Sequence, residues 1–168
     1  MDFKLLPVTK EDIAEFKRDM QEAFQYGAAE EFSDVDEEIL PENDIDESLS
    51  KKGAFAYKAV TDGKMVGGAI VVIDVASQHN HLDFLYVKYG EQSRGIGQKI
   101  WNEVENLYPD TRVWETCTPY FEKRNIHFYI NCLGFHAVEF FNPHHKDSSI
   151  PNDMIGGDYF IRFEKAMK

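Results

Sequence analysis

Hydrophobic residues recur at intervals of three and four in three stretches of the chain, which is the spacing that one face of a helix requires. The members of these sets are Ile13, Phe16, Met20 and Phe24, then Ile96, Ile100, Val104 and Leu107, and finally Ile126, Tyr129, Ile130 and Leu133. Shorter segments rich in β-branched and aromatic residues predict strands. They span residues 3–8, 54–60, 65–75, 81–88, 111–117, 135–141 and 159–163. Together these segments predict a mixed α/β or α+β domain with one central sheet.

Polar residues and glycines mark where these elements begin and end. Thr9 is placed to cap the first helix, with Glu11 and Asp12 in its first turn near the positive end of the helix dipole. Asp62-Gly63 predicts a tight hairpin turn between two strands. Because no internal repeat and no low-complexity linker interrupts the pattern, residues 1–168 are predicted to form a single domain.

The charge of the chain is strongly negative and unevenly distributed. The net charge is −12, which disfavours nucleic acid and anionic membranes as partners, since both are bound through Lys and Arg. Residues 30–47 hold ten carboxylates and no Lys or Arg, and this segment is predicted to form a loop and a short second helix. It is either a solvated acidic surface or a region that attracts a cationic molecule.

The cysteines and histidines do not follow the pattern of a disulfide framework or a structural zinc site. Cys117 and Cys132 are the two cysteines, and they form no CxxC motif. His79-x-His81 has no Cys or further His at a structural zinc spacing, so no metal is predicted. The N-terminus does not resemble a signal peptide, and no apolar run approaches the ~20 residues that cross a bilayer. A cytoplasmic location is therefore expected.

A glycine-rich turn joins the strand predicted at 81–88 directly to a helix. Gly95 and Gly97 give the main chain conformations that other residues avoid, and they let a ligand approach the backbone. Free N–H groups at the helix start favour an anion such as a pyrophosphate, and Arg94 adds a positive charge. Alternatively, the glycines only form a tight turn. The dinucleotide fingerprint GxGxxG is not met, because no further glycine or alanine follows at the required spacing.

The turn also carries a resemblance to a known family. Gln92-Ser93-Arg94-Gly95-Ile96-Gly97 resembles the motif Gln/Arg-x-x-Gly-x-Gly/Ala that the GNAT superfamily of N-acetyltransferases has between its fourth strand and third helix. An aromatic-rich helix that ends in Gly-Phe, at 127–135, is similar to a second signature of that family. The resemblance implies the GNAT fold, a mixed and mostly antiparallel sheet of about six to seven strands. This sheet is splayed between strands 4 and 5 and flanked by about four helices.

In that family the splayed sheet holds acetyl-CoA, and the resemblance implies where it would lie here. The pantetheine arm would follow Leu85, Tyr86 and Val87. Asn125 and Tyr129, on the helix after the fifth strand, would complete the site. The residues that would hold the pyrophosphate are Gln92, Ser93, Arg94, Gly95, Ile96 and Gly97.

The resemblance implies that Tyr129 is a general acid that protonates the CoA thiolate. In the family pattern the tyrosine lies four residues before the glycine of Gly-Phe, whereas Tyr129 lies five residues before Gly134. One extra residue at the helix end would restore the register, and without it the side chain would be turned by ~100°. Alternatively, Tyr129 packs in the core with its hydroxyl reaching outward.

The amine acceptor must lose a proton before it attacks, and three side chains are candidates for the base. Period-two geometry places His81, Asp83, Leu85 and Val87 on one face of their strand. His81 and Asp83 are therefore two of the candidates, and Glu115 on the next strand is the third. Each of the three is alternatively a structural or solvated residue, and deprotonation through water needs no single base.

The predicted function is acetyl transfer from acetyl-CoA to a primary amine, either a cationic small molecule or a peptide, by direct attack in a ternary complex. Cys117 and Cys132 lack a paired base, so no acyl-enzyme is expected. Two rival functions are a non-catalytic acyl-CoA sensor of the same fold and a nucleotide-binding domain. The sequence leaves open whether the chain is a monomer or a homodimer.

Overall fold

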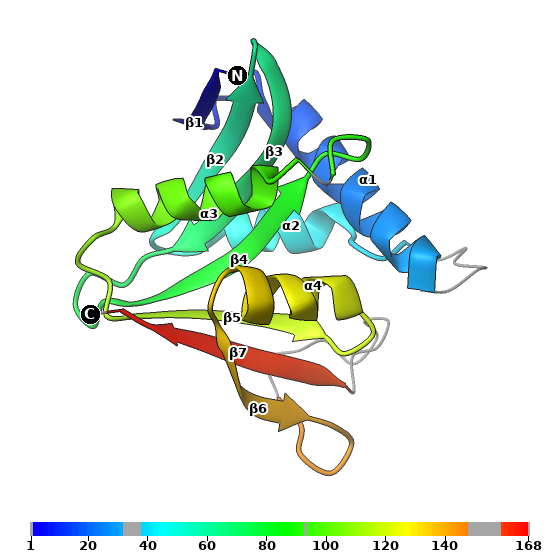
Figure 1. Cartoon of the computed structure of the whole chain (residues 1–168), viewed down its shortest axis with the longest axis vertical. Coiled ribbons are helices and arrows are strands. Elements are labelled where there is room, and N and C mark those ends of the chain that lie inside the picture. The colour runs from blue at the N-terminus through cyan, green and yellow to red at the C-terminus, as the bar shows by residue number, and fades with distance from the viewer. Residues whose placement is uncertain (1, 32–37, 93, 148–158, 168) are drawn as a thin grey trace.

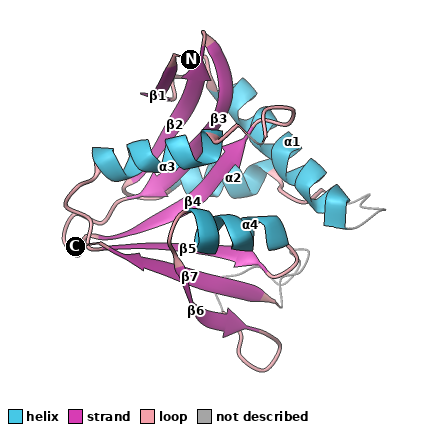
Figure 2. Cartoon of the chain, in the orientation of Figure 1, coloured by secondary structure: helices cyan, strands magenta, loops and turns pink. Residues whose placement is uncertain are grey.

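The computed structural model describes residues 2–31, 38–92, 94–147 and 159–167. A mixed sheet forms the centre of this part of the chain, and helices pack against both of its faces (Figure 1 and Figure 2). Its strands are β1 (Phe3–Pro7), β2 (Ala54–Thr61), β3 (Lys64–Val72), β4 (His79–Val87), β5 (Val113–Pro119), β6 (His136–Phe141) and β7 (Phe160–Ala166). The helices are α1 (Ile13–Glu31), α2 (Glu42–Ser50), α3 (Ile96–Leu107) and α4 (Lys123–His127), and α4 continues into the π-helical turn η1 (Phe128–Cys132). The predicted fold class is confirmed.

The sheet has the strand order β1-β2-β3-β4-β5-β7-β6, and within the described residues only β4 and β5 run parallel. These two strands form a backbone ladder over three residue pairs, the last of which joins His81 to Glu115. Both strands continue past this pair without pairing to each other in the described structure. At the fork, the Thr116 hydroxyl donates a hydrogen bond to the Leu82 carbonyl (2.8 Å). The splay that was predicted between strands 4 and 5 is therefore present.

A β-bulge in β4 changes the direction in which its side chains point. The pairing with β3 shifts by one residue, so Asp83 has no partner opposite it. Asp83 and Phe84 therefore both face α1 and α2, while Leu85 and Val87 pack on the opposite face of the sheet. The prediction that His81, Asp83, Leu85 and Val87 share one face is wrong, because the period of two does not continue through a bulge.

Each face of the sheet has its own apolar core. Trp101 of α3 packs edge-on against Trp114 of β5 on one face, with ring centroids 5.1 Å apart. On the other face, Phe16 of α1 packs against β3 and β4. Gly68 of β3 allows this close approach, because an added Cβ would lie 2.6 Å from a ring carbon of Phe16. In the described ranges no helix is long and apolar enough to cross a membrane.

The start of α1 is stabilised by Asp12 and not by Thr9 as predicted. The Asp12 carboxylate oxygen Oδ2 accepts hydrogen bonds from both the N–H (2.9 Å) and the hydroxyl (2.8 Å) of Thr9. Lys58 of β2 lies 2.9 Å from the same oxygen. In this arrangement the Thr9 hydroxyl acts as a donor, and the side-chain acceptor at the helix start is the Asp12 carboxylate.

Candidate active site

A cavity of about 700 Å³ opens where β4 and β5 separate. Its walls come from the end of β4, the glycine-rich turn, the start of α3, part of α1, and α4 with η1. The predicted cofactor-binding residues that line it are Leu85, Tyr86, Val87, Gln92, Gly95, Ile96, Gly97, Asn125 and Tyr129. Ser93 lies outside the described residues. Arg94 does not line the cavity, and its side chain is 63% exposed and pairs with Glu91 at 3.5 Å.

The backbone of β4 presents polar groups to the gap in the sheet. The Lys88 N–H donates to the Val66 carbonyl of β3 (2.8 Å). Because successive backbone groups of a strand point to opposite sides, the N–H and C=O groups of Leu85 and Val87 point away from β3. They therefore face the opening on the β5 side and are free to pair with an extended ligand.

The glycine-rich turn ends with its helix start exposed to the same cavity. Gly95 precedes α3 with φ 73°, a left-handed conformation, and an added Cβ there would meet nothing within 4 Å. At Gly97 an added Cβ would lie 2.8 Å from the ring of Phe128, so this glycine lets α3 pack against η1. The first turn of α3 contains no acidic residue, and its first N–H groups have no partner within the helix. This turn is consequently suited to an anionic group.

The helix that carries Tyr129 contains one extra residue, which was one of the two possibilities left open by the spacing between Tyr129 and Gly134. In η1 the Leu133 N–H donates to the Phe128 carbonyl, five residues earlier (3.0 Å). A π-helical turn inserts one residue into an α-helix without breaking it. The spacing of five residues between Tyr129 and Gly134 is accommodated in this way, and the Tyr129 side chain lines the cavity.

Tyr129 is both packed in the core and in contact with the cavity. Its ring lies among those of Phe128, Phe135 and Phe163 at centroid distances of 5.7 to 5.9 Å, and the residue is 6% exposed. Burial raises the pKa of the Tyr129 hydroxyl to about 12, and the nearby Thr116 hydroxyl acts in the opposite direction. The hydroxyl is therefore protonated at neutral pH and able to donate a proton.

A second cavity of about 250 Å³ adjoins the first and has an acidic lining. It lies between α2, β4, β5 and the loop before α4. Its carboxylates belong to Asp44, Glu47, Asp83 and Glu122. Phe24, Glu122, Asn125 and Tyr129 line both cavities. Tyr129 thus stands at the boundary between a large cleft and a small acidic pocket.

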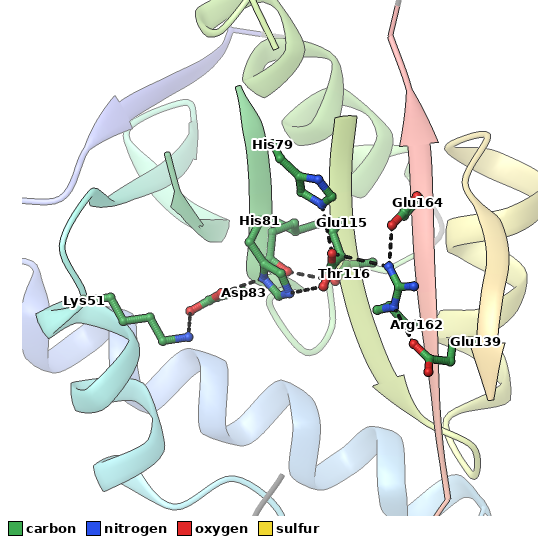
Figure 3. A network of polar contacts seen from close by, with 10 residues as sticks. Lys51, His79, His81, Asp83, Glu115, Thr116, Glu139, Arg162 and Glu164 are labelled. Carbon is green, nitrogen blue, oxygen red and sulfur yellow. Dashed lines mark hydrogen bonds and ion pairs between the residues drawn. The ribbon is translucent and has the colours of Figure 1, made fainter. Parts of the chain in front are cut away.

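His81 and Asp83 form a hydrogen-bonded pair at the wall of the second cavity (Figure 3). His81 Nδ1 lies 2.7 Å from Asp83 Oδ1, while Asp83 Oδ2 accepts from the Ser48 hydroxyl (2.6 Å) and Lys51 Nζ (2.8 Å). Burial raises the pKa of the Asp83 carboxyl, but His81, Lys51 and Ser48 outweigh burial and lower it to about 2. Asp83 is therefore ionised and only accepts hydrogen bonds, so His81 donates to it from Nδ1, and Nε2 is the ring nitrogen left for another partner.

Glu115, the third candidate base, lies outside the linings of both cavities. Its carboxylate lies 2.9 Å from His79 Nε2 and 3.5 Å from Arg162 Nη1. Four residues of the site were not predicted from the sequence, namely Phe24, Ser48, Lys51 and Glu122. They reach the site from α1, α2 and the loop before α4, and no motif links them to the glycine-rich turn.

Replacing Asp83 with asparagine is expected to destabilise the fold by roughly 2 kcal/mol at pH 7, the value of a carboxyl pKa lowered from about 4 to about 2. Because the pKa is lowered in the folded state, this contribution is present above about pH 4 and lost as the pH falls towards 2. Urea unfolding of both proteins between pH 7 and pH 3 measures it. A stability difference that stays constant over this range would assign the effect to packing instead of charge.

Comparison with known proteins is consistent with this geometry. The model of the acetyltransferase (GNAT) family matches residues 13–135. Protein YrkN of Bacillus subtilis is 44% identical over 173 residues, which cover 98% of this chain and 94% of YrkN. Both are matches between sequences, and the matched part of this chain includes the glycine-rich turn.

Solved structures share the fold at low sequence identity. The ribosomal-protein-S18-alanine N-acetyltransferase of Escherichia coli superposes with a TM-score of 0.73 at 12% identity, covering 99% of this chain and 95% of that one. The PaiA N-acetyltransferase of Thermoplasma acidophilum, in complex with coenzyme A, gives 0.70 at 18% identity, covering 99% and 100%. This chain therefore has the same fold as these two acetyltransferases.

Proposed function

Because the chain belongs to the GNAT family of acetyltransferases, we propose that it transfers an acetyl group from acetyl-CoA to a primary amine. Acyl transfer is the chemistry of the family. The observation that carries the proposal is the position of Tyr129, on the boundary between the large cleft and the acidic pocket. A donor in the first cavity and an acceptor in the second would meet beside its hydroxyl.

The first cavity fits a molecule with a diphosphate and an extended amide-containing arm. The turn at Gly95 would hold the diphosphate through N–H groups, aided by the α3 dipole. The outward-facing backbone groups of Leu85 and Val87 would pair with the arm as a neighbouring strand does. The Thermoplasma acidophilum relative was solved with coenzyme A, which supports the same ligand class here.

Two side chains would move the protons of the reaction. His81 Nε2 would take a proton from the ammonium form of the acceptor, with Asp83 holding the imidazole in place. Asp83 itself is a poor candidate for the base, because a carboxylate with a pKa of about 2 binds a proton only weakly at neutral pH. Tyr129 would give its proton to the thiolate that leaves. Cys117 is unsuited to a covalent route, because burial raises the pKa of its thiol to about 12.

The acceptor proposed for the second cavity is a cationic amine. Among the described residues, four carboxylates and one lysine, Lys51, line this pocket, together with apolar side chains such as Phe24, Phe84 and Phe160. Such a lining favours a positively charged molecule with an apolar body. Residues 32–37 of the acidic segment lie outside the described part, but Asp44 and Glu47 bring its remainder to the pocket.

Replacing Glu47 with glutamine is expected to raise KM for a diamine on the order of fivefold at low ionic strength, as for a charge contact worth about 1 kcal/mol. KM for a neutral amine should change little, and added salt should reduce the effect. Steady-state kinetics with both acceptors measures this. The matched control is Asp46→Asn on the same helix, because Asp46 pairs with Lys17 at 2.9 Å and does not line the pocket.

Replacing Gly95 with alanine is expected to raise the Kd for CoA about tenfold, equivalent to about 1.4 kcal/mol, because alanine disfavours the left-handed backbone with which this lining residue begins α3. The left-handed conformation should also lower the free energy of unfolding by about 1 kcal/mol. Gly63→Ala is the matched control, since Gly63 has φ 79° and open space around it in the β2–β3 turn. Calorimetry should show weaker CoA binding for Gly95→Ala only, and equal loss of affinity in both would contradict the assignment.

The proposed function is tested by measuring thiol release from acetyl-CoA with a panel of cationic, peptide and neutral amines. Turnover with a cationic amine is the expected result. Binding of acetyl-CoA with no release on any amine would instead indicate the non-catalytic sensor of the same fold. Thermal stabilisation by NAD or ATP in place of acetyl-CoA would contradict both functions.

A further inference from the structure

A cluster of metal-ligating side chains lies on the face of β4 and β5 towards α2 (Figure 3 shows His81 and Glu115). His81 of β4 is paired in register with Glu115 of β5, and Cys117 follows two residues later on the same side of β5. His81 Nε2 and Glu115 Oε2 are 3.7 Å apart. The sulfur of Cys117 completes a group whose ligand atoms all lie within 4.8 Å of one another. Two adjacent strands thus bring together a nitrogen, an oxygen and a sulfur ligand.

These distances fit a tetrahedral transition-metal site after a small adjustment. Zn–N and Zn–O bonds of about 2.1 Å place two ligand atoms about 3.4 Å apart at the tetrahedral angle. The separation of His81 and Glu115 is already close to that value. The Cys117 sulfur lies within 4.8 Å of both other ligand atoms, compared with about 3.6 Å for a nitrogen and a sulfur bound to one zinc ion.

The groups behind the three ligands hold them with the correct atoms facing inward. Asp83 accepts from Nδ1 of His81 at 2.7 Å, which leaves Nε2 as the ligand nitrogen. Glu115 is held through Oε1, which lies 2.9 Å from His79 and 3.5 Å from Arg162, so Oε2 faces His81. A carboxylate behind a ligating histidine is the usual arrangement at protein zinc sites.

The charge around the cluster also favours a divalent cation. Asp83 and Glu115 each carry a negative charge. Arg162 lies 3.5 Å from Oε1 of Glu115 and offsets part of the charge of that carboxylate. Cys117 would bind as the thiolate, whose negative charge a divalent cation stabilises.

We propose that His81, Glu115 and Cys117 bind a divalent transition metal ion of the zinc type. A fourth position would remain for water or a small ligand, since His81 and Cys117 also line the second cavity. The prediction that the chain has no metal site depended on ligand spacing along the sequence. Here the ligands are assembled by the register between two strands, which that spacing does not reveal. A second group, His79, Glu115 and Glu164, offers no sulfur ligand and is the weaker candidate.

The experiment is a titration of the full chain with Co²⁺, followed by absorption in the near ultraviolet, where a thiolate bound to Co²⁺ gives a charge-transfer band. The wild-type protein should develop the band up to one equivalent, and Zn²⁺ should remove it. Cys117→Ser should abolish the band, whereas Cys132→Ser should keep it. Absence of the band in the wild type, or its loss with Cys132→Ser alone, would overturn the proposal.

Zn²⁺ calorimetry supplies an independent measurement on the same protein. Asp83→Asn should weaken Zn²⁺ binding about tenfold or more, as expected for the partner of a ligating histidine, and Glu115→Gln should weaken it as well. His144→Gln, at an exposed position in the β6–β7 connection, is the control and should bind as the wild type does. Equal affinity in all of these variants would mean adventitious binding and contradict the site. Neither measurement uses acyl transfer, so a failure of the metal site and a failure of the proposed function are distinguished. A metal and a proton would compete for His81 Nε2, so the metal-bound form would lack the base proposed above.

Discussion

Replacing Tyr129 with phenylalanine is expected to lower kcat for acetyl transfer about 100-fold, the lower end of what a general acid contributes. The Tyr129 hydroxyl, with its pKa raised to about 12 by burial, stays protonated through the neutral range, and the residue lines both cavities. The variant keeps the aromatic ring and its packing against Phe135 and Phe163. Its affinity for CoA and its melting temperature should therefore change little.

Steady-state kinetics and calorimetry with CoA measure these two effects separately. Tyr120→Phe is the matched control, because Tyr120 is 49% exposed on the loop before α4 and lines neither cavity. An unchanged kcat for Tyr129→Phe would show that another group or water protonates the thiolate. A loss of CoA binding equal to the loss of kcat would assign the tyrosine to the shape of the cleft.

Replacing His81 with alanine is expected to lower kcat/KM about 100-fold at pH 7, as for the loss of a general base. The deficit should shrink as the pH rises, because the acceptor then loses its proton to solvent without help. His79→Ala is the matched control, since His79 lies two residues away on the same strand and does not line either cavity. The pH dependence of kcat/KM for the three proteins is the measurement.

A deficit of the same size at every pH would contradict the role of His81 as a base. These assays should contain a chelator, so that a metal held by His81 does not enter the comparison. Under that condition the kinetics report on proton transfer and the Co²⁺ titration reports on the metal site.

The sequence predicted the elements and the turn well because both depend on neighbouring residues. Helical and strand periodicities are local, and Gly95 adopts the left-handed backbone that its residue type favours. The spacing between Tyr129 and Gly134 left the register of the tyrosine open, and the structure has a π-helical turn at this position.

The remainder of the site depends on long-range pairing, which a local pattern does not contain. The bulge that turns Asp83 towards α2 arises from its pairing with β3. Ser48 and Glu122 lie far apart in the chain, and no periodicity relates them. The proximity of His81 to Cys117 follows from the register of two parallel strands.

The ladder between β4 and β5 is short, and this affects how the two parts of the sheet are held together. Three residue pairs join the sheet of β1 to β4 to that of β5, β7 and β6. We therefore expect the two halves of the sheet to change their relative angle more easily than the strands within each half, with the Thr116 hydrogen bond to Leu82 as a further contact between them. A ligand bound between β4 and β5 would restrict the angle between these two parts of the sheet. Hydrogen–deuterium exchange at the amides of Leu85 and Val87 should slow when CoA binds, while exchange in the paired core of β3 stays the same.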